Sequence, residues 1–320
     1  MRKNDPILVA GGETLLGAAL VRRLRRAGYA GVVDSGERNA DLTDERQVNA
    51  LMAASKPRYL FVAAGKVAGI AGNQKFPADL ITNNLLVTLN VIRAAHECQP
   101  CKMVYLASSC SYPRNCAQPM RVEDLMSGRL EPTNQAYATS KLAGIQLCQA
   151  YRRQFGDEFI AAIPANYFGI EDDFSVEDSH VVGALIQRMH AARERGDASV
   201  TIWGTGKARR EFMFADDIAE ACMRVMEAYS GEAPINLSGG EDVTIAQLAE
   251  MIKVVVGFAG ELCYDATRPD GMPMKALDGT AMAALGWKPQ NSLREGLAQT
   301  YAAYVEQLNC KQECRGTAHA

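Results

Sequence analysis

The sequence predicts an α/β protein with a Rossmann-type doubly wound parallel sheet and a smaller mixed α/β substrate-binding domain. Two observations lead to this fold class. Short apolar segments alternate with longer segments that have apolar residues at helical spacing, and after residue 166 this alternation loosens. Strands that alternate with helices form βαβ units around a parallel sheet. A length of 320 residues exceeds one simple core, so two domains are expected.

The first half supplies most of the predicted elements. The predicted strands are apolar runs at residues 7–11, 31–34, 59–65, 102–108 and 159–166. The predicted helices have apolar residues on one face and cover residues 15–28, 44–55, 77–98 and 134–156. In the second half we expect helices over 217–231 and 244–257 and strands over 199–204 and 233–238, all in the smaller domain.

These elements divide the chain into two domains. We expect a cofactor-binding domain over residues 1–166, to which some later segments return, and a mainly substrate-binding domain over residues 167–310. Residues 311–320 are expected to form a disordered tail. The sequence has no internal repeat and no low-complexity linker, so the two domains are expected to pack tightly.

Composition and cysteine usage indicate a globular, cytoplasmic protein. The chain is 48% apolar with a net charge of −3, which gives no reason to expect a nucleic acid or a membrane as partner. It has no signal-like apolar start and no apolar run of about 18 residues. Nine cysteines indicate reduced thiols, and Cys98 and Cys101 form a lone CxxC that predicts no metal site.

The stretch GGETLLG, residues 11–17, follows the first strand as a cofactor-binding loop would. A glycine turn before a helix lets backbone N–H groups meet a pyrophosphate. Thr14 replaces the middle glycine of the usual GxxGxxG pattern and offers a hydroxyl to phosphate, whereas Glu13 adds a negative charge there. The expected cofactor contacts in this loop are Gly11, Glu13, Thr14, Leu15 and Gly17.

The end of the second strand bears on the choice between NAD and NADP. Asp34 suits a free ribose 2′-hydroxyl and repels a 2′-phosphate, as Glu13 also does. Ser35 and Arg38 favour the phosphate instead. Both cofactors therefore stay open at this point.

Further along the chain, a serine, a tyrosine and a lysine together predict reductase chemistry. Tyr137 and Lys141 are four residues apart and share one face of a helix. The ammonium favours the phenolate and helps Tyr137 to donate a proton to a nascent alkoxide. Ser108 stands at the end of the fourth strand, where open α/β sheets bind ligands, so it is expected to meet Tyr137 over the nicotinamide.

In this order, the glycine turn, the serine and the YxxxK pair resemble the extended short-chain dehydrogenase/reductase family, which acts on nucleotide sugars. Within that family the chain is most similar to the GDP-L-fucose synthases, the GDP-4-keto-6-deoxy-D-mannose epimerase/reductases. The resemblance covers nearly the whole chain. It rests on AAGKVAGI (63–70), FPADLI (76–81), SSCSYP (108–113), LEPTNQAYATSKLAGI (130–145), SHVVGALI (179–186), WGTGKARREFMFADD (203–217) and PDGMPMK (269–275).

The resemblance implies a role for each catalytic residue. Cys110 is the base and His180 the acid in two epimerisations beside a ketone. Ser108 and Tyr137 bind the C4 oxygen, and Tyr137 donates a proton when hydride reaches C4. Lys141 holds Tyr137 and the nicotinamide ribose.

The resemblance also implies partners and binding residues. The family binds a GDP-sugar, generally prefers NADPH, and pairs two long helices of each protomer into a homodimer. Expected substrate contacts are Asn166, Trp203, Arg210 and Lys275, and further cofactor contacts are Ala63, Ala64 and Asn84. Met274 departs from the basic residue that is usual at its position.

Two alternatives stay open. The chain can be a relative that acts on another GDP-4-keto sugar and only epimerises or only reduces it. It can also be a non-catalytic dinucleotide sensor, which Thr14 and Glu13 leave open. A sensor has no need for the complete catalytic set, which is Ser108, Cys110, Tyr137, Lys141 and His180.

Overall fold

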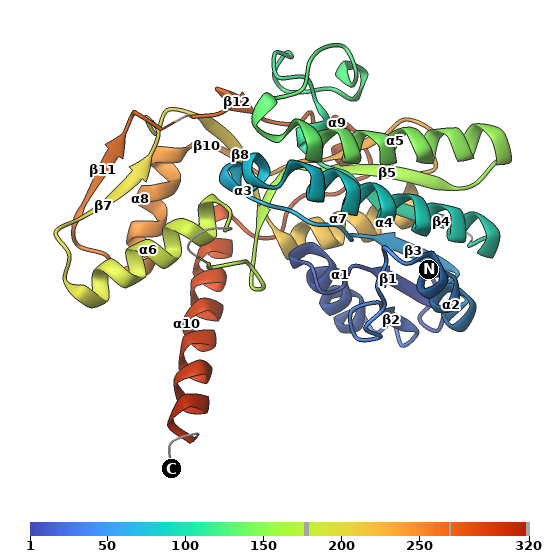
Figure 1. Ribbon diagram of the computed structural model, residues 1–320, viewed down its shortest axis with the longest axis horizontal. Helices are drawn as coiled ribbons and strands as arrows, with labels where there is room; N and C mark the ends of the chain where they lie inside the picture. Colours follow the sequence, from blue (N-terminus) through green and yellow to red (C-terminus); the bar gives the residue numbers. More distant parts are fainter. Residues whose placement is uncertain (101, 176–178, 269, 318–320) are drawn as a thin grey trace.

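The protein is analysed as a computed structural model, which describes residues 1–100, 102–175, 179–268 and 270–317 (Figure 1). A six-stranded parallel sheet forms its centre, in the order β2-β1-β3-β4-β5-β9. Its strands are β1 (Ile7–Ala10), β2 (Val32–Asp34), β3 (Tyr59–Val62), β4 (Lys102–Leu106), β5 (Phe159–Pro164) and β9 (Ile235–Leu237). The strands are apolar runs because helices cover both faces of the sheet.

Two layers of helices make the sheet doubly wound. The helices α1 (Leu15–Arg26) and α7 (Ala215–Ala228) pack side by side on one face. On the other face α4 (Pro77–Cys98) packs between α2 (Glu45–Ser55) and α5 (Gln135–Phe155). The predicted fold class is confirmed, and the predicted helix over residues 77–98 has the observed bounds.

Two segments that we assigned to the smaller domain belong to this central sheet. Helix α7 buries Ile218, Cys222 and Val225 in the same core as the strands. Strand β9 is fully buried and pairs in parallel with β5. We expected some later segments to return to the first domain but did not identify these two, because a buried strand and an amphipathic helix carry no local mark of the sheet on which they pack.

The smaller part has its own sheets and its own core. In one sheet β8 (Arg209–Phe214) lies between β10 (Glu241–Thr244) and β12 (Met274–Lys275), and β6 (Asn166–Phe168) also pairs with β8. The other sheet joins β7 (Ser199–Trp203) to β11 (Glu261–Asp265). The covering helices are α6 (Val181–Arg195), α8 (Ile245–Val256) and α10 (Leu293–Thr317). Their apolar faces meet Phe168, Phe212 and Phe214 in a second core.

Short elements complete the chain. They are α3 (Ile70–Lys75), α9 (Thr280–Ala284) and three 3-10 turns, Ser109–Ser111, Val122–Asp124 and Pro132–Asn134. Helix α10 extends into the segment expected as a tail, and residues 318–320 lie outside the described part, as does Cys101 of the CxxC pair. Within the described residues, no helix has the length and hydropathy needed to cross a membrane.

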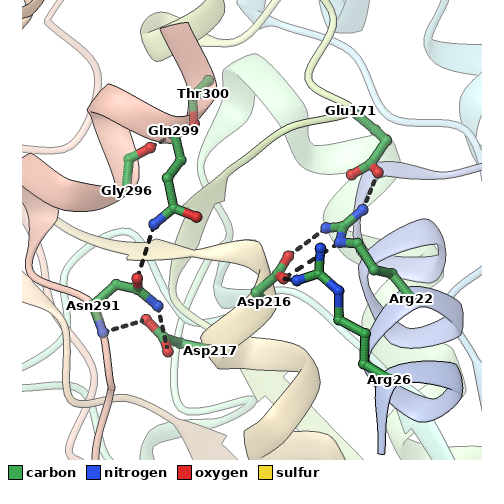
Figure 2. A network of polar contacts seen from close by, with 9 residues as sticks. All are labelled: Arg22, Arg26, Glu171, Asp216, Asp217, Asn291, Gly296, Gln299 and Thr300. Carbon is green, nitrogen blue, oxygen red and sulfur yellow. Dashed lines mark hydrogen bonds and ion pairs between the residues drawn. The ribbon is translucent and has the colours of Figure 1, made fainter. Parts of the chain in front are cut away.

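The start of α7 ties the two parts together (Figure 2). Asp216 accepts from Arg22 of α1, and the same guanidinium contacts Glu171 on the loop before α6. The next residue, Asp217, accepts from the backbone of Gln290 at 3.0 Å and of Asn291 at 3.2 Å, just before α10. One helix terminus therefore fixes the position of the smaller part on the central sheet.

Candidate active site

A cleft of about 420 Å³ opens where the ends of β4 and β5 face the smaller part. It gathers nearly all residues predicted for catalysis and substrate binding, although they come from distant segments. These are Ser108, Cys110, Tyr137, Asn166, His180, Trp203, Arg210 and Lys275. A second cavity, about 710 Å³, lies between Pro113 and Gln135 and contains none of them.

Tyr137 brings a buried phenol to the cleft. Its side chain is buried on the first turn of α5, and burial raises the pKa of the phenol well above its ordinary value. Ser108 forms a side-chain hydrogen bond to it that acts in the opposite direction. Tyr137 therefore holds its proton at neutral pH, beside the serine hydroxyl that shares the cleft.

Lys141 lies one turn further along α5, below the edge of the sheet. Its Nζ donates to the carbonyl oxygens of Leu106 at 3.2 Å and Ala64 at 3.4 Å. Burial lowers the pKa of this ammonium to about 8. Asn84 lies nearby; its Oδ1 is buried and has no hydrogen-bond partner among the described residues, while its amide donates to two backbone carbonyls. An ammonium and an orphan acceptor thus stand ready for hydroxyl groups of a ligand.

Cys110 is held by two donors. Lys275 Nζ and Asn134 Nδ2 each lie 3.2 Å from its Sγ. Burial raises the pKa of the thiol, but the positive charges of Lys275 and Arg210 and a hydrogen bond to Ser108 together lower it below its ordinary value. We expected Lys275 to contact the substrate; in the structure it lines the cleft and its ammonium contacts the thiol.

His180 stands immediately before α6 and forms no side-chain cap of that helix. Its side chain is open to the cleft but has protein on its other sides, which lowers its pKa, while the Asp173 carboxylate opposes this shift. The imidazole therefore does not cap α6 and faces the same cleft as Cys110.

The glycine loop has the geometry of a dinucleotide-binding turn. Gly11 has a φ of +95°, and a Cβ there would lie 2.4 Å from the backbone of Ala64. A Cβ on Gly17 would lie 1.9 Å from the Gly11 carbonyl oxygen. Thr14 caps α1: its Oγ1 accepts from Gly17 N at 3.1 Å and donates to the Gly11 carbonyl at 2.8 Å. We predicted that the Thr14 hydroxyl would contact phosphate, but it forms its hydrogen bonds inside the loop. Leu15 lies at the start of α1, and Ala63 follows β3.

The turn after β2 places two carboxylates near the loop. Asp34 is buried, and its Oδ1 accepts from the backbone of Gly36 at 2.8 Å. Glu13 is exposed and reaches the same turn. Ser35 is buried and its Oγ accepts from Gly11 N at 2.8 Å, so this hydroxyl supports the loop instead of facing a ligand. Arg38 is exposed and is the cation of this turn.

Sequence reasoning missed two further cleft residues, Arg188 and Asn134. The Arg188 guanidinium lies 5.1 Å from the centre of the Trp203 ring, and burial lowers its pKa. In the described part of the chain neither Arg188 nor Arg210 pairs with a carboxylate side chain. Helical spacing from His180 would have found Arg188, because residues 181, 184, 185 and 188 of α6 all line the cleft.

Glu211 is a structural support of the cleft that the sequence did not reveal. Its Oε1 accepts from Ser238 Oγ at 2.8 Å, and its Oε2 from Leu277 N at 3.0 Å. Asn166, which we expected to bind a ligand, lines the cleft and donates to the Glu211 backbone carbonyl at 3.0 Å. This carboxylate therefore joins the end of β9 to the segment that carries Lys275.

A doubly wound sheet with a glycine turn, a buried Tyr–Lys pair and a neighbouring serine defines an oxidoreductase-type enzyme that binds a nicotinamide dinucleotide. The chain belongs to the NAD dependent epimerase/dehydratase family, whose model matches residues 7–243. Within this family it is similar to GDP-L-fucose synthases. It is 46% identical to the probable GDP-L-fucose synthase 1 of Oryza sativa, over 96% of this chain and 94% of the relative. It is 39% identical to the GDP-L-fucose synthase of Escherichia coli, over 94% and 96%.

Solved structures agree with this placement. A GDP-6-OMe-4-keto-L-xylo-heptose reductase from Campylobacter jejuni superposes with a TM-score of 0.90 at 31% identity, over 96% of this chain and 99% of the other. A GDP-L-fucose synthetase from Naegleria fowleri bound to NADP superposes with a TM-score of 0.88 at 25% identity, over 97% and 96%. The predicted family and fold are confirmed.

Proposed function

We propose that this protein converts GDP-4-keto-6-deoxy-D-mannose to GDP-L-fucose, by epimerisation at C3 and C5 and NAD(P)H-dependent reduction at C4. The observation that carries the proposal is that Cys110 and His180 face one cleft together with Ser108 and Tyr137. A simple reductase needs the serine and the tyrosine but has no use for a second acid and base. The names of the relatives, several of them GDP-L-fucose synthases, support the same substrate.

In the epimerisation, the Cys110 thiolate takes the proton from C3 or C5. The electron pair of the broken C–H bond forms an enolate, and the hydroxyls of Ser108 and Tyr137 stabilise its oxygen at C4. Protonated His180 then donates to the other face of the same carbon. Cys110 is left as a thiol and His180 as a neutral imidazole, so both exchange protons with solvent before the second carbon reacts.

The reduction uses Tyr137 as the acid. The raised pKa of its phenol keeps the proton available until negative charge develops on the C4 oxygen. Arg188 and Arg210 are cleft cations without carboxylate partners in the described chain, and they suit the two charges of a nucleotide diphosphate. That diphosphate also brings negative charge into the cleft, which favours the protonated form of His180.

A nicotinamide cofactor fits the residues present. Gly11 and Gly17 let the loop pack closely against Ala64 and against itself, as a tight dinucleotide-binding turn does, and Lys141 and Asn84 Oδ1 lie at the sheet edge for ribose hydroxyls. When bound, this cofactor supplies the hydride for C4. NADP is bound in a structural neighbour. We propose that NADH serves this protein at least comparably, because Asp34 and Glu13 oppose a 2′-phosphate, which Arg38 favours.

We also propose a homodimer that pairs α4 and α5 of two protomers. Leu85, Leu86 and Leu89 of α4 are each more than a third exposed, although α4 is a central helix of the sheet layer. A row of exposed leucines on one helix face suits an apolar partner surface. We place the enzyme in the cytoplasm, because Cys110 acts only as a free thiol and thiols stay reduced in that compartment.

The experiment that tests the function is turnover of GDP-4-keto-6-deoxy-D-mannose with NADPH or NADH in heavy water, read by mass and proton spectra of the sugar. The parent protein should place deuterium at C3 and C5 and release GDP-L-fucose. Cys110→Ser should lose exchange at both carbons but still consume reduced cofactor slowly, which gives the unepimerised isomer.

The variant His180→Gln separates acid from base. It should impair epimerisation but retain proton exchange at one carbon, because the base is still present. Reduction without exchange in the parent protein would favour a reductase of another GDP-4-keto sugar. Exchange at both carbons at the normal rate in Cys110→Ser would show that the thiol is not the base.

A further inference from the structure

The sulfur of Cys110 accepts two hydrogen bonds from segments that are distant in the sequence. Lys275 Nζ and Asn134 Nδ2 both lie 3.2 Å from Sγ. A thiol is a weak acceptor, whereas a thiolate is a strong one, and charge-assisted hydrogen bonds are the stronger kind. Two donors on one sulfur, one of them cationic, match a thiolate better than a thiol.

Lys275 is committed to this contact. Its side chain is 9% exposed, and across the described residues no carboxylate forms an ion pair with it. The short strand β12 pairs in register with β8, which sets Lys275 opposite Arg210. Two residues further on, Leu277 N donates to the buried Glu211 carboxylate at 3.0 Å. The backbone is thus pinned on both sides so that the ammonium reaches the sulfur.

Asn134 stands at the N-cap position of α5 but does not cap the helix. It occupies the residue before α5, where an asparagine normally accepts a hydrogen bond from the first turn of the helix. Here it makes no such cap, its Oδ1 accepts no hydrogen bond from the part of the chain that the structure describes, and its amide donates to Cys110. The Asn134 side chain therefore binds the sulfur of Cys110 and does not cap α5.

Building on the proposed function, we propose that Lys275 and Asn134 are positioning residues that keep Cys110 deprotonated and oriented in the resting enzyme. The proton of the substrate passes from carbon to this sulfur, and Lys275 keeps its own protons throughout. The cations whose charge acts on the sulfur are Lys275 and Arg210, and Ser108 adds a hydrogen bond, while Cys110 in turn raises the pKa of the neighbouring phenols of Tyr137 and Tyr167. Of these, only Lys275 combines full charge with direct contact.

The test is the pH dependence of alkylation of Cys110 by iodoacetamide in the resting protein, followed peptide by peptide in a mass spectrometer. The parent should react with a midpoint below about 8.5, the value of a free thiol. Lys275→Met should raise the midpoint by about 1–3 pH units, whereas Lys275→Arg should keep most of the shift. Asn134→Asp should raise the midpoint too, because it sets a negative charge beside the sulfur.

Lys207→Met is the matched control, since Lys207 is exposed and lies outside the cleft lining; its midpoint should equal that of the parent. If Lys275→Met keeps the parent midpoint, the proposal is wrong. If that variant does not fold, the thiolate absorbance of Cys110 is measured instead, as the absorbance of the parent minus that of Cys110→Ser at each pH. A thiolate that appears only above about pH 8.5 would overturn the proposal. These measurements need no substrate. If the alkylation midpoint of Cys110 is low but the protein fails to epimerise the sugar, the proposed function is overturned and the role of Lys275 and Asn134 stands.

Discussion

The carboxylate of Asp34 lies directly against the backbone of Gly12. A Cβ on residue 12 would lie 2.0 Å from Asp34 Oδ1 and 2.2 Å from its Cγ. The carboxylate cannot move away freely, because Oδ1 accepts from Gly36 N at 2.8 Å. The first turn of the cofactor loop and the end of β2 therefore fit together only because residue 12 has no side chain.

Gly12→Ala should weaken NAD(P)H binding by at least about tenfold and lower the free energy of unfolding by about 1–3 kcal/mol, since the overpacked turn must shift. Asp34→Ala removes the colliding atoms, so the double variant should recover most of the lost stability. Cofactor titration and urea unfolding of the four proteins form a double-mutant cycle. Strictly additive losses would show that the two residues do not collide.

Glu13→Arg should shift cofactor preference toward NADPH. The substitution reverses an exposed charge near the turn after β2, and such a change at a surface site amounts to about 1 kcal/mol, or about fivefold in the ratio of kcat/KM for NADPH and NADH. In the parent, NADH should be used at least comparably. A strong NADPH preference in the parent would mean that Arg38 outweighs Asp34 and Glu13.

Tyr137→Phe should abolish reduction in a folded protein. The phenol is the buried acid of the cleft, and loss of a general acid costs about a hundredfold or more in rate. Consumption of reduced cofactor measures this step, and circular dichroism checks the fold. Exchange at C3 and C5 should persist more strongly than reduction, because Cys110 remains. Reduction near the parent rate would contradict the assignment.

Lys141 should give stability a distinct pH dependence. Its pKa is about 8 in the folded protein and about 10.4 when unfolded, so between these values the unfolded chain binds more protons. The free energy of unfolding of the parent relative to Lys141→Met should therefore rise by about 2–3 kcal/mol from pH 8 to pH 10. Urea unfolding across this range measures the difference, and a constant difference would rule out the lowered pKa.

Sedimentation at micromolar concentration should show a dimer for the parent. Leu86→Glu and Leu89→Glu together should give a monomer, since each buries a charge in the proposed apolar contact between α4 helices. Val254→Glu is a control, because that residue is also exposed but lies on α8. A parent that sediments only as a monomer would contradict the proposed assembly.

The sequence by itself determined most elements of the central sheet and many of the residues that line the cleft. Apolar runs and helical spacing are properties of neighbouring residues, so α4 was predicted with its observed bounds and β3 with its observed start, although the predicted strand ran on to residue 65 and the observed one ends at Val62. Ser108 and Tyr137 were found from the order of the motifs, Cys110 and His180 from the resemblance to the family, and all four line the cleft.

Only the tertiary structure decided which partner each side chain meets. The hydroxyls of Thr14 and Ser35 are turned into the glycine loop, and Lys275 contacts a thiol that lies 165 residues away in the sequence. Likewise β9 joined the central sheet and α7 packed against it, because an apolar surface can be buried against any complementary face. A local pattern states that a residue must be buried or paired, but the partner is chosen by the packing of the whole chain.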